Sequence, residues 1–222
     1  TINDYRGDII YPEFCLKTLN QTEPEIIFHM AAQSLVRKSY TDPINTFNTN
    51  IIGTANILQA VRECDSVKTV VVITSDKCYE NIEKRYAYVE TDPLGGYDPY
   101  SSSKACAEHV VSAYYRSFFK GKGLGLATAR AGNVIGGGDW SSHRIIPDAV
   151  SAWSKNKKLI IRNHQAIRPW QHVLEPLSGY ISLAENLSEQ AGDFSGAWNF
   201  GPDQNSVNTV FDVIKLASRE WY

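Results

Sequence analysis

The sequence of 222 residues lacks a long hydrophobic run, because no stretch approaches the roughly 18 apolar residues that a membrane-spanning helix needs. A spanning protein is therefore excluded, and no membrane partner is expected. An excess of either charge is also missing, since 22 Lys and Arg stand against 24 Asp and Glu and give a net charge of -2. No basic stripe alternates with aromatic residues, so nucleic acid is not an expected partner.

Cysteine is scarce, and its four copies are scattered at Cys15, Cys64, Cys78 and Cys106 without a CxxC pair. This pattern favours a reducing compartment over a disulfide framework, so we expect a cytoplasmic protein. The histidines have no metal-ligand spacing, and no metal site is expected. The amino terminus has neither a signal-peptide pattern nor a starting Met, which indicates a fragment.

What the sequence does have is an alternation of strand-like and helix-like segments. Short apolar runs at residues 25–29, 68–73 and 125–130 are typical of strands that are buried on both faces. Residues 43–62 and 100–119, which lie between them, place apolar side chains at helical spacing. The order predicts a doubly wound parallel sheet, an α/β fold in which ligands bind beyond the carboxyl ends of the strands.

The composition changes after Arg130, where the three glycines at residues 136–138 begin a stretch rich in Trp, His, Arg and Pro. We place the boundary of a second, smaller unit near residue 133. A strand is expected at residues 159–162 within it. A further strand near residues 197–202 and a helix over residues 207–221 are expected to return to the large sheet.

One pair of residues at a predicted helix start indicates chemistry. Tyr100 and Lys104 form a YxxxK, and one helical turn places both on the same face. An ammonium near a phenol lowers the phenol's pKa from about 10 toward neutrality, which would let Tyr100 take a proton from a hydroxyl. The alternative is a surface pair that arose by chance in a chain with 12 tyrosines. Ser75, which follows the preceding strand, favours the functional interpretation because its hydroxyl could contact the same substrate oxygen.

Ser75, Tyr100 and Lys104 in this order resemble the catalytic triad of the extended short-chain dehydrogenases/reductases that modify nucleotide sugars. Further motifs match that family: the HxAA of His29-Met30-Ala31-Ala32, the TN pair of Thr49-Asn50, the RxxNxxG of residues 130–136, and Asp8-Ile9 as the acidic-aliphatic pair that contacts adenine. The resemblance extends over nearly the whole chain and implies a Rossmann-like fold.

Within this family the closest resemblance is to the subfamily of CDP-glucose 4,6-dehydratases. Four long motifs carry it, at residues 74–81, 95–100, 132–140 and 167–176. The related thymidine diphosphate glucose dehydratases have Thr-Asp-Glu where this chain has Ser75-Asp76-Lys77. Lys77 thus replaces the carboxylate that removes the C5 proton there, and two roles stay open for it: base at C5, or positioning of the sugar.

The resemblance implies a lyase that converts CDP-glucose to CDP-4-keto-6-deoxyglucose with NAD as cofactor, and a homo-oligomer, either a dimer or a tetramer. It implies an NAD-binding region at residues 1–132, a nucleotide-sugar-binding region at 133–195 and a return to the first domain at 196–222. The implied catalytic residues are Ser75, Asp76, Lys77, Tyr100 and Lys104. The implied cofactor contacts are Asp8, Ile9, His29, Ala31, Ala32 and Asn50, with Tyr100 and Lys104. The implied substrate contacts are Asn133, Arg144, Arg162 and Arg168.

The chain departs from the family in one respect, because it has no GxxGxxG loop for the dinucleotide. We therefore expect both ends of a family member to be missing here, and weak cofactor binding by this chain alone. Two alternatives stay open: an epimerase or reductase of the same family, and a noncatalytic dinucleotide-binding protein. Plainer structural roles are also open for single residues, such as packing for His29 and solvated charge for Arg162 and Arg168.

Overall fold

The structure is a computed structural model that describes residues 2–84, 86–203 and 208–221. It divides into two compact units, and each is described by itself. The first unit comprises residues 1–131 and 178–199, and the second comprises residues 132–177 and 200–222. The chain thus leaves the first unit after residue 131, returns to it over residues 178–199 and leaves it again.

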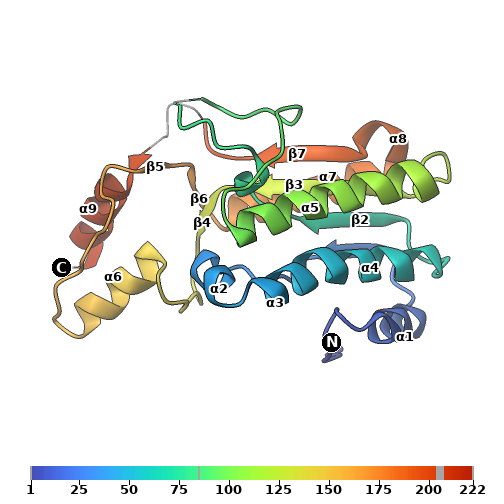
Figure 1. The fold of residues 1–222 in the computed structure, drawn as a ribbon, viewed down its shortest axis with the longest axis horizontal. Helices are drawn as coiled ribbons and strands as arrows, with labels where there is room; N and C mark the ends of the chain where they lie inside the picture. Colours follow the sequence, from blue (N-terminus) through green and yellow to red (C-terminus); the bar gives the residue numbers. More distant parts are fainter. Residues whose placement is uncertain (1, 85, 204–207, 222) are drawn as a thin grey trace. The chain divides into compact units, whose positions relative to one another are not determined.

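A four-stranded sheet forms the centre of the first unit (Figure 1). Its strands lie in the order β1 (Ile26–His29), β2 (Thr69–Ile73), β3 (Gly125–Ala131) and β7 (Gly196–Phe200). The first three are parallel, as the buried apolar runs of the sequence predict. The strand expected near residues 197–202 does return to this sheet.

The register brings the carboxyl ends of the three parallel strands close to one level. His29 lies opposite Val72, and Val72 lies opposite Thr128. Whatever follows each strand therefore emerges at the same edge of the sheet. Polar side chains that are far apart in the sequence meet at this edge.

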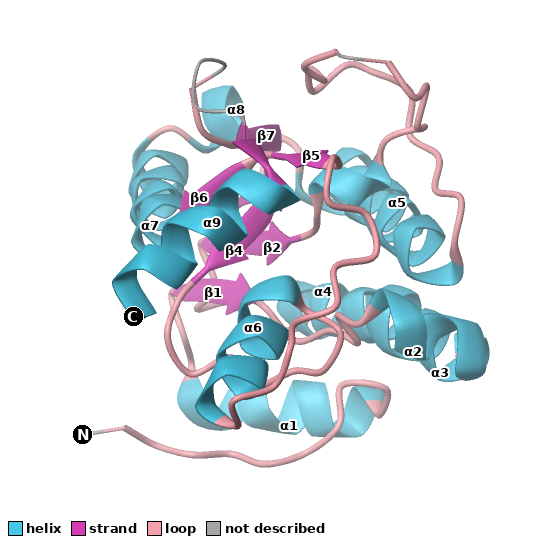
Figure 2. Ribbon diagram, turned by 90° about the vertical axis from the view of Figure 1, so that its left-hand side faces the viewer, coloured by secondary structure: helices cyan, strands magenta, loops and turns pink. Residues whose placement is uncertain are grey.

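One face of the sheet is covered by the helix that precedes β1 and by those that follow β1 and β2, as Figure 2 shows for α4 and α5. The helical content of this layer is α1 (Pro12–Thr22), α2 (Val36–Thr41), α3 (Pro43–Phe47), the π-turn η1 (Asn48–Ile52), α4 (Gly53–Arg62), α5 (Pro99–Tyr114) and the π-turn η3 (Tyr115–Phe119). These bounds confirm the helices expected at residues 43–62 and 100–119. Val70, Val72 and Leu126 of the sheet pack there in one hydrophobic core with Leu58 and Val111 of the helices.

The opposite face is covered by α7 (Leu174–Glu189), a crossover helix that the sequence reading did not predict (Figure 2). Leu187 on it is fully buried, and a Cβ added at Gly125 would lie 2.8 Å from the Leu187 carbonyl oxygen. The Oγ atoms of Thr69 and Ser188 are 2.8 Å apart. The glycine at the start of β3 therefore permits the close approach of this helix, and α8 (Ala191–Phe194) connects it to β7.

The second unit contains short strands and two longer helices. Its elements are β4 (Asn133–Ile135) parallel to β6 (Trp170–His172), β5 (Ile167–Arg168) antiparallel to β8 (Asn208–Thr209), α6 (Ile145–Ser154) and α9 (Val210–Trp221). The ring centroids of Trp153 and Trp221 lie 5.8 Å apart where α6 meets α9.

Two expectations for this region are corrected. Residues 159–162 form no strand, because this apolar run finds no partner strand and the pairing residues begin at Ile167. The final helix belongs to the second unit, where it contacts α6, and not to the unit that contains the large sheet. That helix begins at Val210, and Val207 lies outside the described residues.

In the part of the chain that the structure describes, no helix is both long enough and apolar enough to cross a bilayer.

We predict that Leu187→Ala lowers the free energy of unfolding by about 2 to 5 kcal/mol, because it leaves a cavity between α7 and the sheet. Urea unfolding followed by circular dichroism measures this change. Ile181→Ala on the same helix is the matched control, since Ile181 is 55% exposed and should change stability by less than about 0.5 kcal/mol. Equal effects of the two variants would contradict the burial of α7 against the sheet.

Candidate active site

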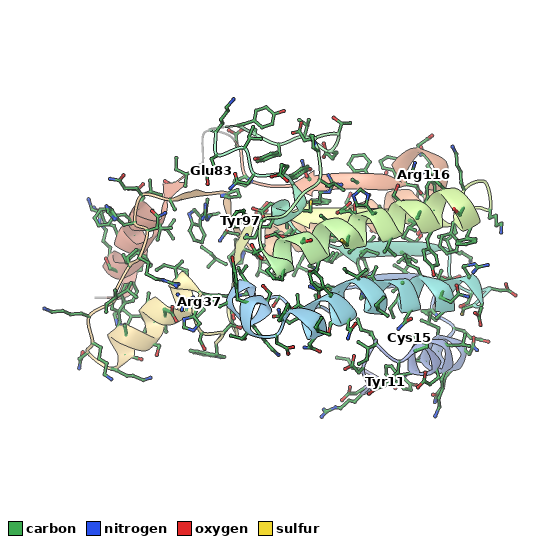
Figure 3. All side chains as sticks on the ribbon, viewed as in Figure 1. Tyr11, Cys15, Arg37, Glu83, Tyr97 and Arg116 are labelled. Carbon is green, nitrogen blue, oxygen red and sulfur yellow. The ribbon has the colours of Figure 1, made fainter. Side chains whose placement is uncertain are left out.

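The first turn of α5 places the YxxxK pair at the edge of the sheet. Asp98 caps the helix, because its Oδ1 accepts from the Ser101 backbone N–H at 3.0 Å and its Oδ2 accepts from the Ser101 hydroxyl at 2.7 Å. Pro99 follows at the first helical position, where its missing N–H costs nothing. Tyr97 and Arg116, labelled in Figure 3, mark the two ends of this helix and its π-turn. The fixed start determines where Tyr100 and Lys104 lie.

Lys104 joins this helix to the end of β2. Its ammonium is buried and donates a hydrogen bond of 2.9 Å to the Ile73 carbonyl oxygen, two residues before Ser75. Tyr100, one helical turn earlier, is also buried. The structure thus brings the YxxxK pair and the Ser75 segment together, as the sequence predicted.

Burial lowers the pKa of Lys104 to about 8, while the charge of Glu108 and the thiol of Cys78 act in the opposite direction. A lysine with such a pKa is mostly charged at neutral pH but titrates within reach of it. A charged Lys104 can favour the phenolate form of a neighbouring tyrosine.

The segment after β2 forms a short 3-10 turn, η2 (Asp76–Cys78), that gathers three polar side chains. The Ser75 hydroxyl accepts from the Lys77 backbone N–H at 3.2 Å and donates to Asp76 Oδ1 at 3.1 Å. Lys77 Nζ lies 3.3 Å from the same Asp76 oxygen, and both side chains are partly exposed. A hydroxyl, a carboxylate and an ammonium are therefore adjacent at the strand end.

His29 ends β1 as a buried, neutral side chain. Its Nε2 lies 3.0 Å from Thr54 Oγ1, while the Thr54 hydroxyl donates to the Asn50 carbonyl oxygen at 2.7 Å. Because Thr54 has a single hydroxyl hydrogen, this pattern requires Nε2 of His29 to be the donor. Burial, with a contribution from the charge of Lys104, lowers the pKa of His29 to about 4.

Asn50 lies in the π-turn η1 and is almost completely buried. Its Oδ1 accepts from the Gln33 backbone N–H at 2.8 Å, and its Nδ2 donates to the Gln33 carbonyl oxygen at 3.1 Å and to Ser103 Oγ at 2.8 Å. Both amide hydrogens of Asn50 are thus used within the protein. The side chain connects the loop after β1 to α5, so its contact with a cofactor stays a prediction.

The other expected cofactor residues lie in two places. Ala31 is exposed and Ala32 is half-buried, directly after β1. Asp8 is exposed and accepts from the Ile10 backbone N–H at 3.1 Å. Ile9 packs against Gly53 at the start of α4, where an added Cβ would lie 2.5 Å from Ile9 Cδ1.

Sequence reasoning missed a buried ion pair behind the site. Arg130 at the end of β3 and Glu108 on α5 are joined by a contact of 2.7 Å between Nη2 and Oε2, and each side chain is only 4% exposed. Hydroxyl groups of Thr74 and Thr128 also donate to the Glu108 carboxylate. A second guanidinium nitrogen of Arg130, Nη1, donates to Tyr79 Oη at 2.8 Å, while Nε is buried without a hydrogen-bond partner among the described residues.

A signal for this pair was present in the sequence. Glu108 interrupts the apolar face of the helix over residues 100–119, and Arg130 ends a buried strand. Charged residues at such positions are almost never buried without a partner. Two opposite charges at core-facing positions therefore indicate a pair.

The expected substrate residues lie in the second unit. Asn133 begins β4, and its Oδ1 is buried without a hydrogen-bond partner among the described residues. Arg144 pairs with Asp139 at 3.0 Å and is exposed. Arg162 and Arg168 are also exposed, and Arg168 Nη1 donates to the Ile167 carbonyl oxygen at 2.9 Å.

Among residues 2–84, 86–203 and 208–221, no group of three or more His, Cys, Asp or Glu side chains is arranged to hold a metal ion.

Comparison with known proteins adds to this geometry. The model of a protein family described as GDP-mannose 4,6 dehydratase matches residues 2–199. The chain is 50% identical over 220 residues to a CDP-glucose 4,6-dehydratase of Salmonella typhimurium, with 97% of this chain and 61% of that protein covered. It is 25% identical to a CDP-paratose 2-epimerase of Salmonella typhi, with 95% and 67% covered.

A solved structure of a dTDP-glucose 4,6-dehydratase from Streptomyces venezuelae with NAD bound matches with a TM-score of 0.81 and 25% identity. The match covers 97% of this chain and 62% of that one. The chain thus spans about three fifths of the dehydratases that it resembles.

We predict that the free energy of unfolding falls by about 1.4 kcal/mol per pH unit as the pH is lowered from about 6.5 to about 4. In this pH window His29 is protonated in the unfolded protein but stays neutral in the folded protein, where it is buried. Acidification through the window therefore lowers the free energy of unfolding. Urea unfolding at a series of pH values measures the slope. His29→Gln should lack this component, and an unchanged slope in that variant would contradict the assignment.

Proposed function

Since the chain belongs to the GDP-mannose 4,6-dehydratase family, we propose that the protein is a lyase that converts CDP-glucose to CDP-4-keto-6-deoxyglucose and water. The observation that carries the proposal is the hydrogen bond from Lys104 to the Ile73 carbonyl oxygen, because it joins the helix that carries the YxxxK pair to the end of the strand that precedes Ser75, Asp76 and Lys77. The 50% identity to a CDP-glucose 4,6-dehydratase supports the choice of substrate.

The reaction requires a ketone at C4, because the C5 proton becomes acidic only when a neighbouring carbonyl delocalises the negative charge. NAD, when bound, accepts the hydride from C4 and supplies it to C6 at the end of the cycle. Ala31 and Ala32, which follow β1, and Lys104 on α5 would hold its nicotinamide ribose. Ala31 and Ala32 are small, and Lys104 has three N–H donors, of which the bond to Ile73 uses one.

Tyr100 takes the proton from the C4 hydroxyl in this proposal. The buried ammonium of Lys104 favours the phenolate that this step needs. Ser75 turns its hydroxyl from Asp76 to the C4 oxygen of the sugar, which requires only rotation about one bond.

Asp76 and Lys77 serve the elimination. Asp76 takes up a proton from the Lys77 ammonium and gives it to the departing C6 hydroxyl, which leaves a neutral Lys77 amine that can accept the C5 proton. The hydrogen bond between Ser75 and Asp76 supports contact of both with the same sugar. Lys77 lies 3.3 Å from Asp76 and contacts the C5 region, either as the base or as a positioning group. This pair favours dehydration over epimerisation, which loses no water.

The second unit contributes the contacts to the nucleotide sugar in this proposal. The buried Oδ1 of Asn133, which has no hydrogen-bond partner in the described part of the chain, suits a hydroxyl donor. The guanidinium groups of Arg144, Arg162 and Arg168 suit a diphosphate. A homo-oligomeric state and a cytoplasmic location also remain predictions.

The reaction itself can be tested with nucleotide-activated glucoses that carry deuterium at C4. We expect the full-length protein to form a 4-keto product from CDP-glucose and to deliver the label to C6, because the hydride is transferred within one cycle. Mass spectrometry and NMR of the product locate the label. Deuterium left at C4, with inversion at a carbon and no loss of water, would indicate the epimerase alternative.

We predict that Tyr100→Phe reduces turnover by about 100-fold to 10,000-fold, because it removes the group that accepts the C4 proton and changes little volume. Binding of CDP-glucose, measured by calorimetry, should stay nearly unchanged. Tyr97→Phe is the matched control, since Tyr97 is 96% exposed and has no proposed role in the reaction. Normal turnover of Tyr100→Phe would exclude Tyr100 as the base.

A further inference from the structure

The buried carboxylate of Glu108 is connected to two parts of the proposed site: the segment that carries Ser75, and Lys104 on the same helix. Thr74, which directly precedes Ser75, donates its hydroxyl to Glu108 Oε1. Lys104 lies one helical turn before Glu108 on α5. We propose that Glu108 is a positioning residue that holds Thr74, and with it Ser75, in place and maintains the positive charge of Lys104. This inference rests on the proposed function.

The two oxygens of the carboxylate have different partners. Oε2 accepts from Thr128 Oγ1 and from Arg130 Nη2, both at 2.7 Å. Oε1 accepts from Thr74, which is its hydrogen-bond partner within the described ranges of the chain. The side of the carboxylate toward β3 is thus anchored twice, and the other oxygen is directed at the segment that carries Ser75.

Arg130 fixes the orientation of this carboxylate. Its guanidinium carbon lies 4.9 Å from the centroid of the Tyr79 ring, and its Nη1 donates to the Tyr79 hydroxyl and to the Glu90 carbonyl oxygen at 3.1 Å. Tyr79 Oη in turn donates to Asn199 Oδ1 at 2.6 Å. These contacts hold the Arg130 guanidinium in one orientation, so it is a rigid donor to Glu108. The Glu108 carboxylate therefore stays in place if the segment at Thr74 shifts.

Thr74 transmits this rigidity to the turn that begins with Ser75. The Thr74 backbone N–H donates to the Ala129 carbonyl oxygen at 2.9 Å, and the Cys78 backbone N–H donates to the Ser75 carbonyl oxygen at 3.2 Å. The chain at Thr74 is therefore held by its backbone on β3 and by its side chain on α5. Displacement of a reacting group by about 1 Å can cost about 100-fold in rate.

Glu108 also acts on Lys104 through its charge. The Lys104 ammonium bonds to the Ile73 carbonyl oxygen of β2, and the titratable groups near it include Glu108 and Tyr100 on α5, Cys78 on η2 and His29 on β1. Burial lowers the pKa of Lys104, and the charge of Glu108 is the largest of the influences that raise this pKa again. His29 is neutral at physiological pH, and the positive charge of Arg130, 2.7 Å from Glu108, offsets part of the effect of Glu108 on Lys104.

Thr74→Val and Thr128→Val form a matched pair that tests the positioning. Both remove a buried hydroxyl that donates to the same carboxylate, but only Thr74 precedes Ser75 and only Thr128 shares its oxygen with Arg130. In the full-length protein we expect Thr74→Val to lower kcat by about 10-fold to 100-fold with KM within about twofold. Thr128→Val should leave kcat within about twofold, and Thr74→Ser, which keeps the hydroxyl, should restore it.

Equal losses of kcat in the two valine variants would overturn the positioning role. If Glu108 had only a structural role, removal of either hydroxyl donor would lower kcat to the same extent. Urea unfolding of both variants accompanies the kinetics. Loss of stability alone should be similar for the two, since both side chains are buried and both substitutions remove one hydroxyl.

A second variant, Glu108→Gln, tests the effect on Lys104. The pKa of Lys104, followed by NMR of its labelled ε-carbon and assigned with Lys104→Met, should fall by at least half a pH unit. An unchanged pKa would overturn this part of the proposal. The titration of Lys104 needs no substrate, so the role of Glu108 can be tested independently of the proposed lyase activity. Absence of turnover of any nucleotide sugar by the unmodified protein would refute only the proposed activity.

Discussion

The buried ion pair between Glu108 and Arg130 is the constraint on which the first unit depends. Both side chains are 4% exposed, so neither charge can be stabilised by water. Loss of one partner of such a pair typically costs about 3 to 5 kcal/mol, because the other charge stays buried and uncompensated. Through Thr74, Thr128 and Tyr79 the pair joins β2, β3, α5 and the turn after β2. These are the elements that present the proposed catalytic residues.

A second polar connection operates on the other side of Lys104. The Asn50 amide bonds to Gln33 after β1 and to Ser103 on α5, while His29 donates to Thr54. The π-turn that contains Asn50 widens the helix at this point, and such turns often occur at functional sites. The edge of the sheet is therefore held by buried hydrogen bonds on both sides of the proposed reaction centre, so its geometry is set before a ligand binds.

The remaining polar groups at this edge differ in how firmly they are held. Lys104 is buried and bonded to a backbone carbonyl, whereas Asp76 and Lys77 are partly exposed and contact each other. A buried group suits a proton transfer that must occur at one fixed atom. A partly exposed pair can adjust to the sugar as water leaves, which agrees with the two roles that remain open for Lys77.

The sequence by itself determined the parallel strands, the helices over residues 43–62 and 100–119, and the joining of Ser75 with the YxxxK pair, because these follow from local periodicity and from the common edge of parallel strands. Only the tertiary structure decided that residues 159–162 form no strand, that α7 covers the second face of the sheet and that α9 packs on α6. It also decided that the Asn50 amide is used within the protein and that Glu108 pairs with Arg130. These outcomes depend on partners distant in the sequence, and no local pattern specifies which partner a buried group will meet.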